Sequence, residues 1–174
     1  INKVHLITKM SQYLKIFNEF NKNDVKYVVL RNYDILKGSV DVSISKSSYN
    51  VAEKILLTNG FIKRPKRFSS IHQGFQKIGD EIIGLDIQIG GVSWNDFIYL
   101  NDEIFIERKK YNFFYVMSNE HQFCMYVIHS ILGKRYFKEK YKIILYGLIE
   151  DVNVDKVKVI LNKLFFFVGN ILYL

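Results

Sequence analysis

Two short apolar segments that each carry a single aspartate constrain the fold of this 174-residue chain more than any other feature. The first runs from Gly38 to Ile44 and contains Asp41, and the second runs from Leu85 to Ile89 and contains Asp86. Both are typical of half-buried strands, where a carboxylate is rare unless it has a partner or a function. Because divalent cations prefer oxygen ligands, two such acids that converge could hold a metal ion beside a triphosphate.

The residue two positions before Asp41 limits this interpretation. Residues two apart on a strand face the same side, so a second metal-binding acid would be expected at position 39. That residue is Ser39, whose neutral hydroxyl is a weaker ligand than a carboxylate. Asp34 and Asp80 are the nearest acids that could compensate, although neither has the required spacing.

The composition indicates a folded protein with a substantial core. Hydrophobic residues make up 49% of the chain and aromatic residues 16%, which argues against disorder. Cys124 is the single cysteine, so we expect no internal disulfide and a reducing, cytoplasmic setting. We also expect no signal sequence and no membrane span, because no apolar run approaches the ~20 residues that a spanning helix needs. The first residue is Ile1 and not Met, as in a piece of a longer protein.

The charge balance favours an anionic partner. The net charge is +8 and the pI is near 9.4, values that fit nucleotide phosphates, nucleic acid or a membrane surface without choosing among them. Lys63, Arg64, Lys66 and Arg67 form a dense basic cluster, which could attract a nucleic-acid backbone or could be a solvated loop.

Hydrophobic periodicity predicts a mixed α/β part followed by a helical part. The expected fold class is α/β (α+β), with an α/β core over residues 1–117 and a C-terminal helical subdomain over 118–174 that packs on the core. The helices are expected at 4–20, from 51 to Asn59, from the N-cap Ser118 onward, near 137–150 and near 154–168. The strands are expected at 25–30, 39–44, 70–78, 82–89, 103–107 and 112–116, with 70–78 and 82–89 forming a hairpin.

The segment from Tyr27 to Phe61 resembles the nucleotidyltransferase superfamily, which includes DNA polymerase beta and small antibiotic nucleotidyltransferases. The signature of that superfamily is a turn after the first strand, an Asp-hydrophobic-Asp pair on the next strand and a third Asp on a later strand. Val40 and Asp41 match the second half of the pair, and Asp86 matches the third acid. Ser39 stands where the first Asp belongs, and the turn at 30–33 looks like that of an uncharacterised bacterial branch.

The resemblance covers roughly residues 5–92 and implies a mixed sheet flanked by helices, with helices following. It further implies a Mg²⁺-dependent transfer of a nucleotidyl group from an NTP to a hydroxyl of a small molecule or sugar, impaired where Ser39 replaces the first acid. Asp41 and Asp86 would be the catalytic and metal-binding residues, and Ser39 would line the site.

Three further residues are candidates for phosphate contacts. Arg31 and Asn32 follow the first strand, where a guanidinium and an amide could meet phosphate oxygens. In the resembled family a basic residue of the helical part often reaches the triphosphate, and Lys134 is the candidate here. Two alternatives remain open: a catalytically silent module that binds nucleotide or protein, and a basic nucleic-acid-binding domain.

Overall fold

The computed structural model describes residues 3–31, 39–65, 69–79, 82–94, 96–134 and 136–172; the side chains of residues 3–9, 134 and 164–172 are not described. The contacts divide the chain into two compact units, Ile1–Val116 and Met117–Leu174. Each unit has its own buried residues.

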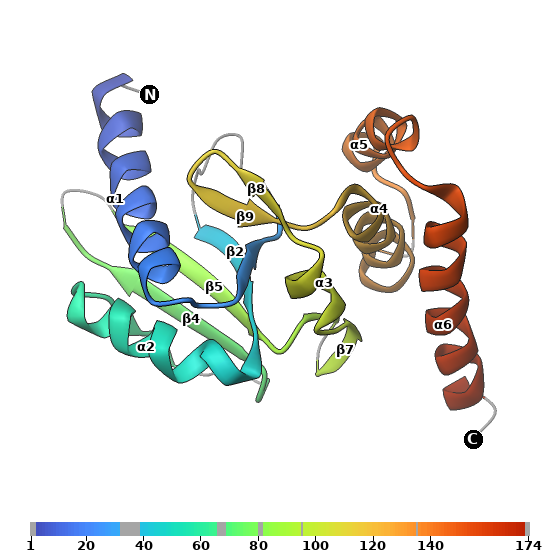
Figure 1. Cartoon of the computed structure of the whole chain (residues 1–174), viewed down its shortest axis with the longest axis horizontal. Coiled ribbons are helices and arrows are strands. Elements are labelled where there is room, and N and C mark those ends of the chain that lie inside the picture. Colours follow the sequence, from blue (N-terminus) through green and yellow to red (C-terminus); the bar gives the residue numbers. More distant parts are fainter. Residues whose placement is uncertain are drawn as a thin grey trace. The chain divides into compact units, whose positions relative to one another are not determined.

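The first unit is built around one mixed sheet (Figure 1). Among the described residues, seven strands pair in the order β3-β4-β5-β2-β1-β9-β8, with β2–β5 and β1–β9 parallel and the other pairs antiparallel. These strands are β1 (Tyr27–Val29), β2 (Ser39–Ile44), β3 (Ile62–Lys63), β4 (His72–Lys77), β5 (Ile83–Ile89), β8 (Lys109–Tyr111) and β9 (Phe114–Val116). A second sheet pairs β6 (Val92–Trp94) with β7 (Phe97–Leu100).

Helices α1 (Lys3–Lys22) and α2 (Tyr49–Thr58) cover one face of the sheet. The strand residues that meet them alternate with polar ones, as the period-2 pattern requires. The shared core consists of Tyr13, Ile16, Phe17 and Phe20 of α1, Ala52 and Leu56 of α2, and Val40, Val42, Ile44, Phe75, Leu85 and Ile87 of the strands. Phe17 stacks on Tyr27 with ring centroids 5.4 Å apart. This packing fixes which side of each strand faces away from the helices.

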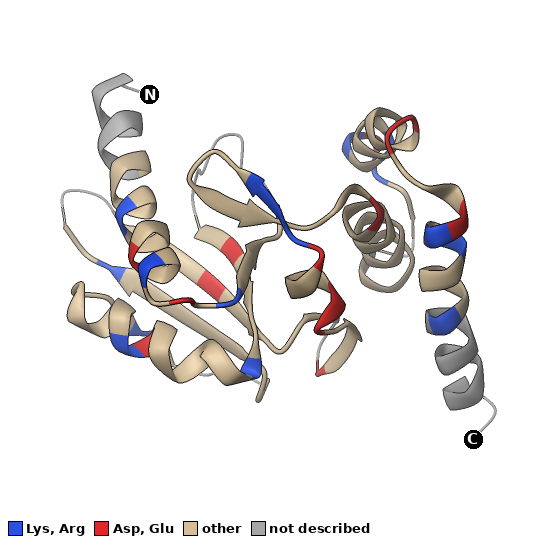
Figure 2. Cartoon of the chain, viewed as in Figure 1, with Lys and Arg blue, Asp and Glu red and all other residues tan. Residues whose placement is uncertain are grey.

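The opposite face of the central strands is polar. Because side chains alternate along a strand, it carries Ser39, Asp41 and Ser43 of β2, Gly84, Asp86 and Gln88 of β5, and His72, Gly74 and Gln76 of β4. Figure 2 shows one acidic band on β2 and one on β5. The candidate acids therefore lie on the face that α1 and α2 leave uncovered.

Most of the predicted elements of this unit are confirmed, and one is wrong. The predicted helices and the hairpin of 70–78 with 82–89 match α1, α2, β4 and β5. Residues 103–107, predicted as a strand, instead contain a short helix, α3 (Glu103–Ile106). Ile104 and Phe105 are both buried, which suits a helix turn better than a strand whose neighbouring side chains face opposite ways. The pair β6–β7 was not predicted, because no strand was expected between 82–89 and 103–107.

The second unit is helical. It contains α4 (Asn119–Ile128), a π-helical continuation over His129–Lys134, α5 (Glu139–Ile149) and α6 (Val154–Leu172). The Ser118 side chain accepts a hydrogen bond from the His121 backbone N–H, so the predicted N-cap is confirmed. Cys124 of α4 is a free cysteine and is buried. No helix in the described part of the chain is both long and apolar enough to cross a lipid bilayer.

Candidate functional site

Asp41 and Asp86 lie side by side on the polar face of the sheet. Strands β2 and β5 run parallel, and their register places Asp41 directly opposite Asp86. Neighbouring strands are about 4.8 Å apart, so two carboxylates in this position repel each other unless cations neutralise them. The structure thus brings together the two acids that the sequence separates by 45 positions.

Arg31 neutralises Asp41. Its guanidinium donates two hydrogen bonds to the same carboxylate oxygen, from Nε at 3.1 Å and from Nη2 at 2.7 Å to Oδ2. Leu30 lies between the end of β1 and Arg31, and its backbone N–H donates to the Asp41 carbonyl at 2.9 Å. This main-chain hydrogen bond therefore helps to fix the backbone from which both side chains extend. Among the described residues, no hydrogen bond reaches the second oxygen of Asp41.

Arg64 neutralises Asp86 in the same way. The ion pair joins Arg64 Nη2 to Asp86 Oδ1 across β4, which lies between them in the sheet. The guanidinium lies over Gly74, the residue that pairs with Asp86, and a Cβ at Gly74 would collide with it. The Arg64 backbone is fixed because its N–H bonds to the Gly74 carbonyl at 2.8 Å. Gly74 thus provides the space that lets Arg64 reach Asp86.

Both ion pairs are only partly buried. The side chains of Arg31 and Asp41 are 29% and 21% exposed, and those of Arg64 and Asp86 are 35% and 44% exposed. Pairs in such contact with water contribute about 0–1 kcal/mol to stability. The arginines therefore neutralise the acids, but the ion pairs are weak enough for another ligand to replace them.

Ser39 lies beside Gly84 at the start of the same pair of strands. The two residues are opposite each other in register, and a Cβ on Gly84 would collide with the Ser39 hydroxyl. On the helix-covered side, the Tyr13 hydroxyl donates to the Gly84 carbonyl at 3.1 Å and accepts from the Gly84 N–H at 3.3 Å. Burial, with a smaller effect from the Asp86 charge, raises the pKa of Tyr13 to about 12, so the hydroxyl keeps its proton at neutral pH.

Replacing Tyr13 with Phe is expected to destabilise the first unit by about 1 kcal/mol, because both hydrogen bonds to Gly84 are lost in a buried position. Urea unfolding followed by circular dichroism measures the loss. Tyr146→Phe is the control, since the Tyr146 side chain is 73% exposed in the second unit. Equal stability of the two variants would contradict the role given to Tyr13.

A polar cluster continues the same face beyond Asp86. The imidazole Nε2 of His72 is 2.6 Å from the hydroxyl of Ser93, and the Ser93 N–H donates to Gln88 Oε1 at 2.8 Å. His72 and Gln88 are partners in the register of β4 and β5, one pair of positions beyond Gly74 and Asp86 on this face. Sequence reasoning missed this cluster, although the alternation of His72, Gly74 and Gln76 was a usable signal.

The other predicted residues have different positions. Asn32 lies outside the described residues, as do Asp34 and Asp80, so the structure does not place them. Lys134 ends the π-helical segment of the second unit, and its side chain is not described. Of the basic cluster, Lys63 pairs with Glu53 at 2.7 Å and Arg64 pairs with Asp86, while Lys66 and Arg67 are not described. Sequence reasoning assigned Arg64 to that loop and missed its position at the acids.

The donor set fits one Mg²⁺ ion that arrives with phosphate oxygens. Mg²⁺ is commonly held by one or two carboxylates together with substrate phosphates and water. Asp41 and Asp86 supply two carboxylates, each with one oxygen that the arginines leave unbound. No group of three or more His, Cys, Asp or Glu side chains suited to a metal was found among the described residues. The residues therefore suit a metal shared with a substrate better than an all-protein metal site.

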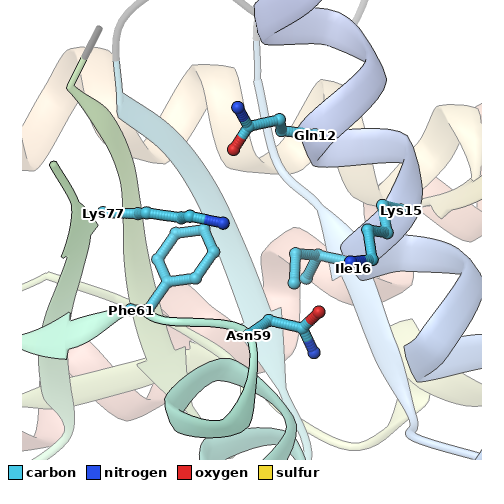
Figure 3. Close-up of a pocket in the computed structure, with 6 residues that line it drawn as sticks. All are labelled: Gln12, Lys15, Ile16, Asn59, Phe61 and Lys77. Atoms are coloured by element: carbon cyan, nitrogen blue, oxygen red, sulfur yellow. The ribbon is translucent and has the colours of Figure 1, made fainter. Parts of the chain in front are cut away.

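A small cavity lies elsewhere, between α1, the end of α2 and β4 (Figure 3). Its lining is Gln12, Lys15, Ile16, Asn59, Phe61 and Lys77. The volume is about 140 Å³, which corresponds to roughly five water molecules and is far below the size of pockets for nucleotide-sized ligands. This cavity is therefore not a nucleotide site, and the polar sheet face is the better candidate.

Comparison with known proteins identifies structural neighbours alone, since no family model and no curated protein matches the chain. A solution structure of the antibiotic-resistance factor ANT(2'')-Ia aligns over 97% of this chain and 97% of its own, with 10% identity and a TM-score of 0.61. A crystal structure of ANT(2'')-Ia in complex with adenylyl-2''-tobramycin aligns over 88% and 94%, with 10% identity and a TM-score of 0.57. ANT(2'')-Ia is an aminoglycoside nucleotidyltransferase. This chain therefore shares the fold of ANT(2'')-Ia, a nucleotidyltransferase-like mixed sheet flanked by helices.

Proposed function

We propose that this protein binds a nucleoside triphosphate on the polar face of the sheet and transfers its nucleotidyl group to a hydroxyl of a small molecule or sugar. The observation that carries the proposal is the register that sets Asp41 opposite Asp86. Two adjacent carboxylates, flanked by two guanidinium groups, form a site with donors for phosphate and acceptors for a metal or a proton. The neighbour ANT(2'')-Ia, solved with adenylyl-2''-tobramycin, supports a small-molecule acceptor.

The two acids differ in exposure, which suggests separate roles. Asp86 is about twice as exposed as Asp41, at 44% against 21%, so a bulky acceptor can approach it more easily. In the proposed reaction the acceptor oxygen forms a bond to the α-phosphorus while the bond from that phosphorus to the bridging oxygen breaks. Pyrophosphate leaves, and the acceptor proton passes to the Asp86 carboxylate.

Asp41 and Asp86 would hold Mg²⁺, which when bound supplies positive charge to the triphosphate. Arg31 and Arg64 add fixed positive charge at the same position, and guanidinium groups pair well with phosphate oxygens. Ser39 lies at the start of β2, where its hydroxyl fills the space that the missing side chain of Gly84 leaves, so it would line the site. Gln88, Ser93 and His72 offer polar groups beyond Asp86, where a hydroxylated acceptor would lie.

Calorimetric titration tests the proposal. Each of the common nucleoside triphosphates is titrated into the protein with Mg²⁺ and with a chelator. We expect binding that requires Mg²⁺ for full affinity, and slow release of pyrophosphate in the presence of polyhydroxylated acceptors. If no triphosphate binds under either condition, the proposal fails.

A second candidate is a nucleotide-binding module without transfer activity, which the two Arg–Asp pairs favour. With Ser39 at the first acid position, the carboxylates and arginines balance each other's charge without a metal. Such a module would bind triphosphate equally well with a chelator present and would release no pyrophosphate. The same titration therefore separates the two candidates.

A further inference from the structure

We propose that Arg31 and Arg64 exchange partners during binding: they hold Asp41 and Asp86 in the empty site and transfer to phosphate oxygens when a metal–triphosphate complex enters. This inference rests on the proposed function and concerns how the same site admits its metal. The exchange couples the two ligands, because the affinity for the metal depends on bound triphosphate and the affinity for triphosphate depends on bound metal.

The charges of the four side chains explain why the exchange is needed. Two carboxylates in direct register repel each other, and the two guanidinium groups balance that repulsion in the described structure. A metal ion that arrives alone competes with both arginines for the two carboxylates and brings no anion for the guanidinium groups in exchange. A metal ion that arrives with a triphosphate brings anionic oxygens that take over both arginines.

The geometry makes this exchange easy. Each arginine is bonded to one oxygen of its carboxylate, Oδ2 of Asp41 and Oδ1 of Asp86. In the described part of the chain, the remaining oxygen of each acid has no hydrogen bond. Both pairs are partly exposed, so water screens them and their net strength is small.

Arg64 is the arginine most clearly positioned for the exchange. Its backbone is fixed by hydrogen bonds to the Gly74 carbonyl at 2.8 Å and from Gln73 Nε2 at 2.9 Å. Its side chain crosses the sheet above Gly74, where the absence of a Cβ leaves room for the guanidinium. The anchor is therefore rigid while the charged end can move from Asp86 to a nearby phosphate.

The test compares the wild type with Arg64→Gln. Three probes are used. Binding of Mn²⁺ alone is followed by electron paramagnetic resonance. Binding of inorganic triphosphate in the presence of a chelator, and of the preformed Mn²⁺–triphosphate complex, is followed by calorimetry. Inorganic triphosphate avoids the unknown base preference. We expect Arg64→Gln to bind Mn²⁺ alone about 10-fold more tightly and the complex about 10-fold more weakly, which removes the coupling.

Two further variants separate this effect from a general change in charge. Lys63→Gln removes the same charge one residue away, from a lysine that pairs with Glu53, and is expected to change neither affinity by more than about 2-fold. Gly74→Ala keeps all charges but places a Cβ against the Arg64 guanidinium, so it should tighten the binding of Mn²⁺ alone as Arg64→Gln does.

The outcomes are distinguishable. If the wild type does not bind the Mn²⁺–triphosphate complex, the proposed function itself fails. If the wild type binds it but Arg64→Gln and Gly74→Ala behave like Lys63→Gln, the partner exchange is overturned and the proposed function stands. Circular dichroism of each variant confirms that the fold is intact.

Discussion

Replacing Asp86 with Asn is expected to lower the rate of nucleotidyl transfer by about 10²–10⁴-fold, the usual contribution of a general base. The substitution keeps the shape of the side chain and removes its ability to accept the acceptor proton. Triphosphate binding should change much less than the rate, because Asp41 and both arginines remain. Pyrophosphate release under saturating nucleotide measures the rate, and calorimetry measures the binding.

The matching control is Asp102→Asn. Asp102 is an exposed acid beside α3, outside the polar sheet face, and it makes no side-chain cap to that helix. Stability should fall by less than about 1 kcal/mol in both variants, because the Arg64–Asp86 pair is partly exposed. Full transfer activity in Asp86→Asn would show that Asp86 is not the base. A loss of activity in Asp102→Asn of the same size would show that the effect is not specific.

The order of elements in the first unit could be predicted from the sequence because its pattern and its packing agree. Strand β2 was predicted residue for residue, since Val40, Val42 and Ile44 alternate with polar residues and all three are buried. The hairpin predicted for 70–78 and 82–89 is confirmed by the antiparallel pairing of β4 with β5. In such segments the local preference and the tertiary environment favour the same structure.

The side-by-side position of the acids could not be predicted in detail. Parallel strands need a long crossover, and the segment that joins β2 to β5 contains α2, β3 and β4, so the register of the two strands does not follow from either strand alone. A shift of one residue would have placed Asp86 on the helix-covered face. The sequence therefore indicated which residues carry the chemistry, but the contact between them depends on the whole sheet.

The position of Arg64 shows a second limit of sequence reasoning. A run of basic residues predicts positive charge, but not which residue turns toward the sheet. Here the choice depends on the pairing of β3 with β4 and on the missing side chain at Gly74, and neither feature can be recognised in the basic run itself. The short helix α3 was missed for a related reason, because brief apolar runs do not distinguish a helix turn from a strand.

Replacing Ser39 with Asp is expected to strengthen Mg²⁺–triphosphate binding by about 10–100-fold, the range by which supporting groups change metal affinity. The new carboxylate would lie on the same face as Asp41, and the lack of a side chain at Gly84 leaves space for it. Without metal, three acids would face two arginines, so repulsion should lower stability by about 1 kcal/mol. The thermal unfolding midpoint should therefore fall in chelator and rise with Mg²⁺ and triphosphate.

Ser39→Asn is the control for this gain, because it has the size of Asp without the charge. It should leave the thermal midpoint in chelator nearly unchanged and should not strengthen metal binding. If Ser39→Asp gains no affinity over Ser39→Asn, the start of β2 does not face the metal, and the proposed site must be centred on Asp41 and Asp86 alone. If it gains affinity and also releases pyrophosphate faster, the neutral residue at position 39 is what limits transfer in the natural sequence.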